Sequence, residues 1–105
     1  MRILKFIVEG QTLSKDPECD FSHIIKGSKD YLGCSFKLPA DWRNIPLAAT
    51  FTHYGKEICA SPVFSGACLV DNAVTDYKNF KISLTAIKNG EIVRTNAVKI
   101  WQEEG

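Results

Sequence analysis

The strongest constraint on the fold is the segment 80–101, which reads as a β-hairpin. Apolar and polar residues alternate from Phe80 to Ala86, and this period of two is typical of a half-buried strand. Asn89-Gly90 follows, and these two residue types suit the positive φ angles of a type I′ turn. The segment therefore predicts two antiparallel strands joined by a two-residue loop.

The predicted hairpin also fixes a register. If Asn89-Gly90 is the loop, residues 88 and 87 face residues 91 and 92, which gives an opposite-charge pair, Lys88–Glu91, and an apolar pair, Ile87–Ile92. Continued downstream, this register sends Val98 to the face opposite Val93, so the apolar phase slips between them. One inserted residue would restore the phase, and we predict a β-bulge there.

The rest of the chain reads as further short strands separated by turn residues. Alternating or continuous apolar runs predict strands over residues 1–9, 31–38, 47–53 and 67–70. Residues 39–46 contain two prolines and no periodicity, which indicates a crossover anchored by Trp42. Short helical turns are expected over 21–26, capped by Asp20, and over 73–77.

These elements predict an all-β fold for residues 1–105. We expect a single domain: an immunoglobulin-like antiparallel β-sandwich of six to eight short strands with at most one or two helical turns. The expected core comprises Phe6, Val8, Leu32, Cys34, Phe36, Trp42, Ala49, Phe51, Cys68, Phe80, Ile82 and Leu84.

The charge and the hydrophobic pattern of the sequence limit the classes of partner that we expect. The formal net charge is +1 and the basic residues are dispersed, which does not favour nucleic acid or an anionic membrane as a ligand. No apolar run approaches the ~18 residues that a membrane-spanning helix needs. The apolar start is interrupted by Lys5 and Glu9 and lacks a small-residue cleavage site, so we expect a first strand and synthesis in the cytoplasm.

The four cysteines show no C-x-x-C spacing that would nucleate a zinc site. A cytosolic chain keeps its thiols reduced, and Cys34 and Cys68 lie on the apolar phase of predicted strands, which indicates buried cysteines acting as small hydrophobes. The alternative left open is a disulfide, either Cys59–Cys68 or Cys19–Cys34. No metal and no other cofactor is expected.

Two weaker chemical hypotheses remain from residue types alone. Cys59 or Cys19 could act as a nucleophile with His53 or His23 as base, although no catalytic signature places them together. The acidic residues Asp16, Glu18 and Asp20 have the look of a calcium loop, but they lack the central glycine and distal glutamate of an EF-hand and are interrupted by Pro17 and Cys19. We therefore expect a protein that is not an enzyme and has no catalytic residues.

Apolar residues occupy both faces of the first and last predicted strands, 1–8 and 93–101. One face of each strand should pack in the core, and the second should need cover from another layer or another chain. Trp101 is a bulky aromatic residue close to the end of the sequence. The residues expected to bind a partner are Leu4, Phe6, Val98, Ile100 and Trp101.

Several short motifs together resemble a group of small proteins encoded by tailed bacteriophages of Firmicutes. At the start these are L-K-F-x-V-x-G-Q over 4–11, Asp16-Pro17 and C-D-F-S over 19–22; near the end they include R-T-N-A-V-K-I over 94–100. The matching residues between them are Gly27, Tyr31-Leu32, Trp42, Ala49, Phe51, Cys68 and Phe80. Such proteins are similar in outline to amino-terminal domains of baseplate upper proteins and to head-fibre or capsid-decoration proteins.

This resemblance implies an immunoglobulin-like virion component that binds other virion proteins without catalysis. It would be made in the cytoplasm of the host bacterium and carried in the virion, as a homo-oligomer or a symmetric array. A capsid decoration role is the leading expectation. A tail or baseplate adaptor, or a free immunoglobulin-like module that binds a host protein, are the alternatives.

Overall fold

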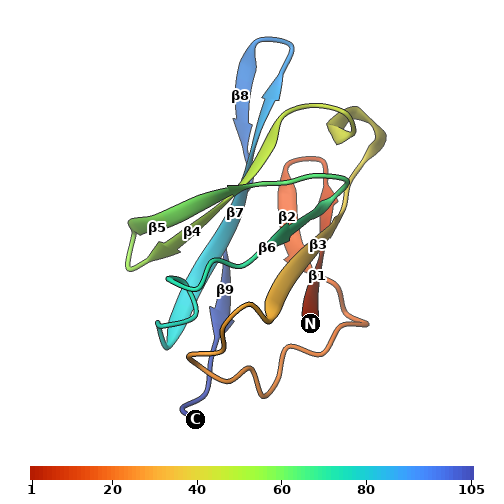
Figure 1. Ribbon diagram of the computed structural model, residues 1–105. Coiled ribbons are helices and arrows are strands. Elements are labelled where there is room, and N and C mark those ends of the chain that lie inside the picture. Colours follow the sequence, from red (N-terminus) through yellow and green to blue (C-terminus); the bar gives the residue numbers. More distant parts are fainter.

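A computed structural model describes residues 1–105 and contains nine strands in two packed sheets (Figure 1). The predicted all-β sandwich is confirmed, with one strand more than the upper limit expected. Its elements are β1 (Arg2–Glu9), β2 (Thr12–Lys15), β3 (Leu32–Lys37), the 3-10 turn η1 (Ala40–Trp42), β4 (Leu47–His53), β5 (Lys56–Pro62), β6 (Ala67–Leu69), β7 (Asn79–Lys88), β8 (Glu91–Arg94) and β9 (Val98–Trp101). No helix is long and apolar enough to cross a membrane.

The first sheet has the strand order β2-β1-β3-β6, and one of its pairings is parallel. β1 and β3 run in the same direction, with Arg2 opposite Leu32 and Phe6 opposite Phe36. This corrects the expectation of a purely antiparallel sandwich. The reason is the long connection over 16–31, which returns past the start of β1 and enters β3 from that same end (Figure 1).

The second sheet has the order β5-β4-β7, and β8 and β9 pair with successive halves of β7 on its other side. Arg94 lies opposite Thr85, whereas Val98 lies opposite Ile82. Three residues, 95–97, therefore face two, 83–84, and the predicted β-bulge is confirmed. Inside the bulge the Thr95 hydroxyl accepts a hydrogen bond from the Leu84 N–H at 3.0 Å.

The β7–β8 hairpin of this sheet has the predicted geometry. Asn89 and Gly90 have φ angles of 52° and 78°, and the predicted pairs Lys88–Glu91 and Ile87–Ile92 both face each other. Two consecutive positive φ values are what a type I′ turn requires, because its twist matches that of the flanking strands. The local sequence therefore determined both the turn and the register.

The core lies between the sheets and contains nearly all the residues predicted for it. Phe51, Ile82 and Leu84 are fully buried, and the Phe6 ring packs on Phe36 at a centroid distance of 5.5 Å. Burial of each large apolar side chain contributes about 1.5–3 kcal/mol. Cys68 is the exception, being only partly buried. The fully or nearly buried apolar residues not anticipated are Leu4, Leu13, Ile24, Val63, Val70, Val74, Ala86 and Ile100.

The expected helical turn over 21–26 is absent. The Asp20 carboxylate instead accepts hydrogen bonds from the Ser22 N–H and hydroxyl, a local arrangement that competes with a helix. The guanidinium of Arg2 donates to the carbonyl oxygens of Asp20, Ser22 and His23, which holds the segment irregular along the start of β1. Residues 73–77 form hydrogen-bonded turns only.

Trp42 is buried at the end of η1. The predicted anchoring of this crossover is therefore confirmed, although the 3-10 turn itself was not expected.

One border of the sandwich is closed by Asn96, which lies in the bulge between β8 and β9. Its side-chain oxygen accepts a hydrogen bond from the Leu13 N–H at 2.8 Å, and its amide nitrogen donates to the Leu13 carbonyl oxygen at 2.9 Å. Asn96 thus occupies the place of a strand neighbour beside β2. Gln11 adds a third link by donating to the Arg94 carbonyl oxygen at 2.8 Å.

Candidate functional site

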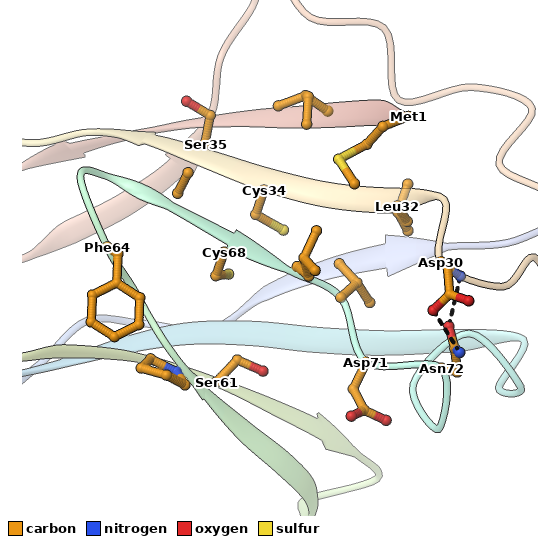
Figure 2. A pocket seen from close by; sticks show the side chains of 15 residues that line it. Met1, Asp30, Leu32, Cys34, Ser35, Ser61, Phe64, Cys68, Asp71 and Asn72 are labelled. Atoms are coloured by element: carbon orange, nitrogen blue, oxygen red, sulfur yellow. Dashed lines mark hydrogen bonds between the residues drawn. The ribbon is translucent and has the colours of Figure 1, made fainter.

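The opposite border of the sandwich is open. At this border the first sheet ends, and β5 of the second sheet diverges from it (Figure 1). A cleft of about 880 Å³ lies beside β6 (Figure 2). We call it the β6 cleft. Its lining residues are Met1, Ile3, Asp30, Leu32, Cys34, Ser35, Ser61, Pro62, Phe64, Ala67, Cys68, Leu69, Val70, Asp71 and Asn72.

The cleft exists because the edge strand is short. β6 comprises only Ala67–Leu69, and the preceding turn is closed by reciprocal hydrogen bonds between Phe64 and Ala67 at 2.9 and 3.0 Å. β5 ends at Pro62 just before this turn, and its beginning lies away from the first sheet (Figure 1). No side chain on this side plays the part that Asn96 plays on the other, and the cleft lies between β6 and the end of β5.

Four large apolar side chains surround the cleft and remain in contact with solvent. Met1 is 67% exposed, Phe64 74%, Leu69 61% and Ile3 39%. Gly33 lies opposite Ile3, and a Cβ atom at this glycine would come within 3.0 Å of the Ile3 Cδ1 atom. The absence of a side chain there lets Ile3 and Met1 lie across β3 and join the apolar surface of β6.

Three polar residues, Asp30, Asp71 and Asn72, lie at one end of the cleft (Figure 2). The Asp30 carboxylate accepts from the Asn72 amide at 3.1 Å, and the Asn72 oxygen accepts from the Asp30 N–H at 2.9 Å (Figure 2). The Asp71 carboxylate accepts a hydrogen bond from the Ala73 N–H at 2.8 Å. These groups shape the end of the cleft, while its middle is apolar.

Two thiols face each other inside the cleft. Cys34 on β3 and Cys68 on β6 are directly opposite in the antiparallel ladder, and their side chains lie close together in Figure 2. Hydrogen bonding with Cys34 lowers the pKa of Cys68, whereas the same interaction and then burial raise the pKa of Cys34. Burial, followed by the charges of Asp71 and Glu57, raises the pKa of Cys59.

All four cysteines are free, so neither of the disulfides considered from the sequence is present. Cys19 lies instead beside β1, where its sulfur accepts a hydrogen bond from the Lys5 N–H at 3.3 Å.

The Cys–His arrangements considered from the sequence are not assembled. His23 Nδ1 lies 2.9 Å from the Glu103 carboxylate, and His53 Nδ1 donates to the Asn79 carbonyl oxygen at 2.8 Å. His53 also packs against the rings of Tyr54 and Tyr77, at 4.3 and 4.4 Å. Neither imidazole is hydrogen-bonded to a cysteine.

The acidic residues 16–20 do not form a calcium loop. Asp16 accepts a hydrogen bond from the Glu18 N–H at 2.9 Å, and the Asp20 carboxylate is engaged by Ser22, which lowers the pKa of Asp20. Nowhere does the structure bring three or more His, Cys, Asp or Glu side chains into an arrangement that could hold a metal ion.

The set of expected partner-binding residues needs correction. Leu4, Phe6 and Ile100 are at most 1% exposed and pack in the chain's own core, so a partner cannot reach them in the folded protein. Val98 is half-buried against that core. Leu4 and Phe6 lie on the inward face of β1, whereas the outward face of this strand carries the exposed Ile3.

Trp101 is the one expected partner-binding residue that is exposed, at 55%. The Lys99 ammonium lies 4.6 Å from the centre of its ring. Lys99 is itself directly opposite Lys81, and these two lysines line a smaller hollow near Tyr54. Trp101 is thus a surface residue beside positive charge, on the second sheet and outside the β6 cleft.

No protein-family model matches the chain, and a search of curated proteins finds no relative. The sequence pattern did not single out the β6 cleft, because the residues that line it come from three separate stretches of the chain, 1–3, 30–35 and 61–72. The two-sided apolar pattern of the first strand was the available signal, since it includes Ile3.

Proposed function

We propose that the protein is a non-enzymatic docking subunit that binds another protein through the β6 cleft. The observation that carries this proposal is the group of exposed apolar side chains, Met1, Ile3, Phe64 and Leu69, around one open cleft. Contiguous exposed apolar surface marks protein interaction sites, and large side chains in concave surfaces supply most of the affinity at protein interfaces. Phe64 is the natural anchor because it is the largest and most exposed of the four.

The apolar cleft is a better docking surface than the neighbouring sheet edge. The outer edge of β5 carries the charged residues Lys56 and Glu57, a register irregularity opposite Phe51–Thr52, and Pro62, which cannot donate a backbone hydrogen bond. These features discourage a further strand from pairing there. A partner would therefore recognise the side chains of the cleft more than the backbone of β5.

The more specific form of the proposal is a bacteriophage virion protein, most specifically a capsid decoration subunit present in many copies. It rests on the resemblance of the sequence motifs to small virion proteins, and the exposed cleft supplies a surface for contact with the particle. The alternatives are a tail or baseplate adaptor and a free module that binds a host protein. These differ in copy number and in whether the protein is present in the particle.

The test is quantitative mass spectrometry of purified virions of the phage that carries the gene. A decoration subunit is expected in many copies that scale with the major capsid protein, and a baseplate adaptor in a small fixed number. Absence from the particle would overturn the virion assignment. A pull-down of a host protein through the same cleft would then favour the free module.

The docking surface itself is tested with Phe64→Ser and Leu69→Ser. Both side chains are largely exposed, so the variants should fold normally and lose at least about 10-fold in affinity for the partner or particle, as truncation of an interface anchor does. Ile92→Ser is the matched control, because Ile92 is 67% exposed on β8 and lies outside the cleft. Equal binding by all three variants would show that the β6 cleft is not the docking surface.

A further inference from the structure

We propose that Cys34 and Cys68 form an oxidisable thiol pair, which a small-molecule disulfide such as oxidised glutathione converts to an intramolecular disulfide. The proposal stands on the β3–β6 register and on the position of both residues in the open β6 cleft. It is independent of the docking function.

The register places the two Cα atoms at a bridgeable separation. The Val70 N–H donates to the Leu32 carbonyl oxygen at 2.9 Å, and the Phe36 N–H donates to the Gly66 carbonyl oxygen at 2.7 Å. The pairs Leu32–Val70 and Phe36–Gly66 are therefore hydrogen-bonded pairs of the ladder. Hydrogen-bonded and non-hydrogen-bonded pairs alternate along an antiparallel ladder, so Cys34–Cys68, midway between them, is also a hydrogen-bonded pair. Such pairs have Cα atoms about 5.5 Å apart, within the range of about 4.4–6.8 Å that disulfides span.

The two thiols also differ in solvent exposure and in pKa, and this difference suits a reaction in which Cys68 reacts first and Cys34 second. Cys68 is only partly buried and lies on the edge strand, whereas Cys34 is 1% exposed. The lowered pKa of Cys68 increases the fraction of reactive thiolate at the accessible position. Cys34 lies directly opposite it in the ladder, placed to attack the Cys68 sulfur once that sulfur carries the small thiol.

The reaction has two steps of thiol–disulfide exchange. The Cys68 thiolate attacks one sulfur of the small disulfide, whose S–S bond breaks and releases the first small thiolate. Cys34 then gives its proton to solvent and attacks the Cys68 sulfur, which releases the second small thiolate. The protein loses two electrons and two protons, and the small disulfide is reduced to two thiols.

Competing pairings are less favourable in the folded chain. Cys59 lies on β5 of the other sheet, opposite Phe51, and its pKa is raised. Cys19 lies beside β1, close to the Ile3 carbonyl oxygen, and is not one of the residues that line the cleft. Cys34–Cys68 is the cysteine pair that a strand register places directly opposite each other, and this is the bridge we expect.

The experiment equilibrates the folded, reduced protein with mixtures of oxidised and reduced glutathione, blocks free thiols with iodoacetamide, and maps disulfides by mass spectrometry. The expected product has lost two hydrogen atoms, with Cys34 linked to Cys68 and both Cys19 and Cys59 alkylated. The same oxidation in urea should instead favour Cys59–Cys68, because that pair closes the shortest loop in an unfolded chain. A folded protein that yields chiefly Cys59–Cys68, or only mixed disulfides with glutathione, would overturn the proposal.

Two variants and one reagent separate the steps. Cys34→Ser should stop the reaction at a mixed disulfide on Cys68, and Cys59→Ser should leave bridge formation unchanged. The arsenical phenylarsine oxide bonds two neighbouring thiols at once, so it should block Cys34 and Cys68 together in the unmodified protein. This measurement decides the case even if Cys34→Ser does not fold, and failure to block both thiols would contradict the proposed proximity.

Discussion

The two hydrogen bonds between the Asn96 side chain and the Leu13 backbone should contribute measurably to the free energy of unfolding. Asn96→Ala removes two hydrogen bonds, at 2.8 and 2.9 Å, from a part-buried site between β2 and the bulge. Each bond contributes about 1 kcal/mol net, and the N–H and C=O groups of the buried Leu13 lose their partners at a part-buried site. We therefore expect the free energy of unfolding to fall by about 2–3 kcal/mol, and Tm to fall by roughly 10–20 °C.

The assay is urea unfolding combined with thermal unfolding, followed by circular dichroism. Gln11→Ala is the matched control, because Gln11 donates one exposed hydrogen bond to Arg94 across the same border and its loss should cost less than about 0.5 kcal/mol. Amide exchange at Leu13 should accelerate in Asn96→Ala. A loss of stability no larger than that of Gln11→Ala would show that Asn96 does not close the border and would refute the reasoning.

Three further predictions follow from the core, the turn and the thiol pair. Leu84→Ala removes a fully buried side chain and should lower the free energy of unfolding by about 2–5 kcal/mol in urea titration, whereas Leu69→Ala, at an exposed position, should change it by less than about 0.5 kcal/mol. Gly90→Val places a branched side chain at a φ of 78° and should cost about 1–2 kcal/mol in the same titration; no change would argue against the type I′ turn. Cys34→Ala removes the interaction that lowers the pKa of Cys68, so the pH profile of Cys68 alkylation by iodoacetamide should move upward and the rate at neutral pH should fall; an unmoved profile would contradict the assigned cause.

The features that the sequence predicted correctly are those determined by neighbouring residues. Asn89-Gly90 fixes its own turn and thereby the pairing of the residues beside it. The phase slip before Val98 predicted the bulge, because a strand with one buried face cannot change face without an extra residue. The alternating strands also identified most of the core, since the core face is the more consistently apolar one.

The features that were missed depend on contacts between distant segments. A strand apolar on both faces does not show which face meets the second sheet, so Leu4 and Phe6 were assigned to a partner although they are core residues. The parallel β1–β3 pairing depends on the path of the connection between them. The Cys34–Cys68 pair and the β6 cleft require that register and the β3–β6 pairing together, which no local pattern contains.

The two sheets also differ in how far apart along the chain their paired residues lie, and this has a consequence for the order of assembly. In β7–β8 the turn residues Lys88 and Glu91 meet across a two-residue loop, whereas Arg2 and Leu32 in β1–β3 meet only after a long segment has been arranged. Closing the longer segment costs more chain entropy before any contact compensates for it. The hairpin should therefore acquire protection in pulse-labelled hydrogen exchange before β1 and β3 do, and simultaneous protection of all strands would contradict this order.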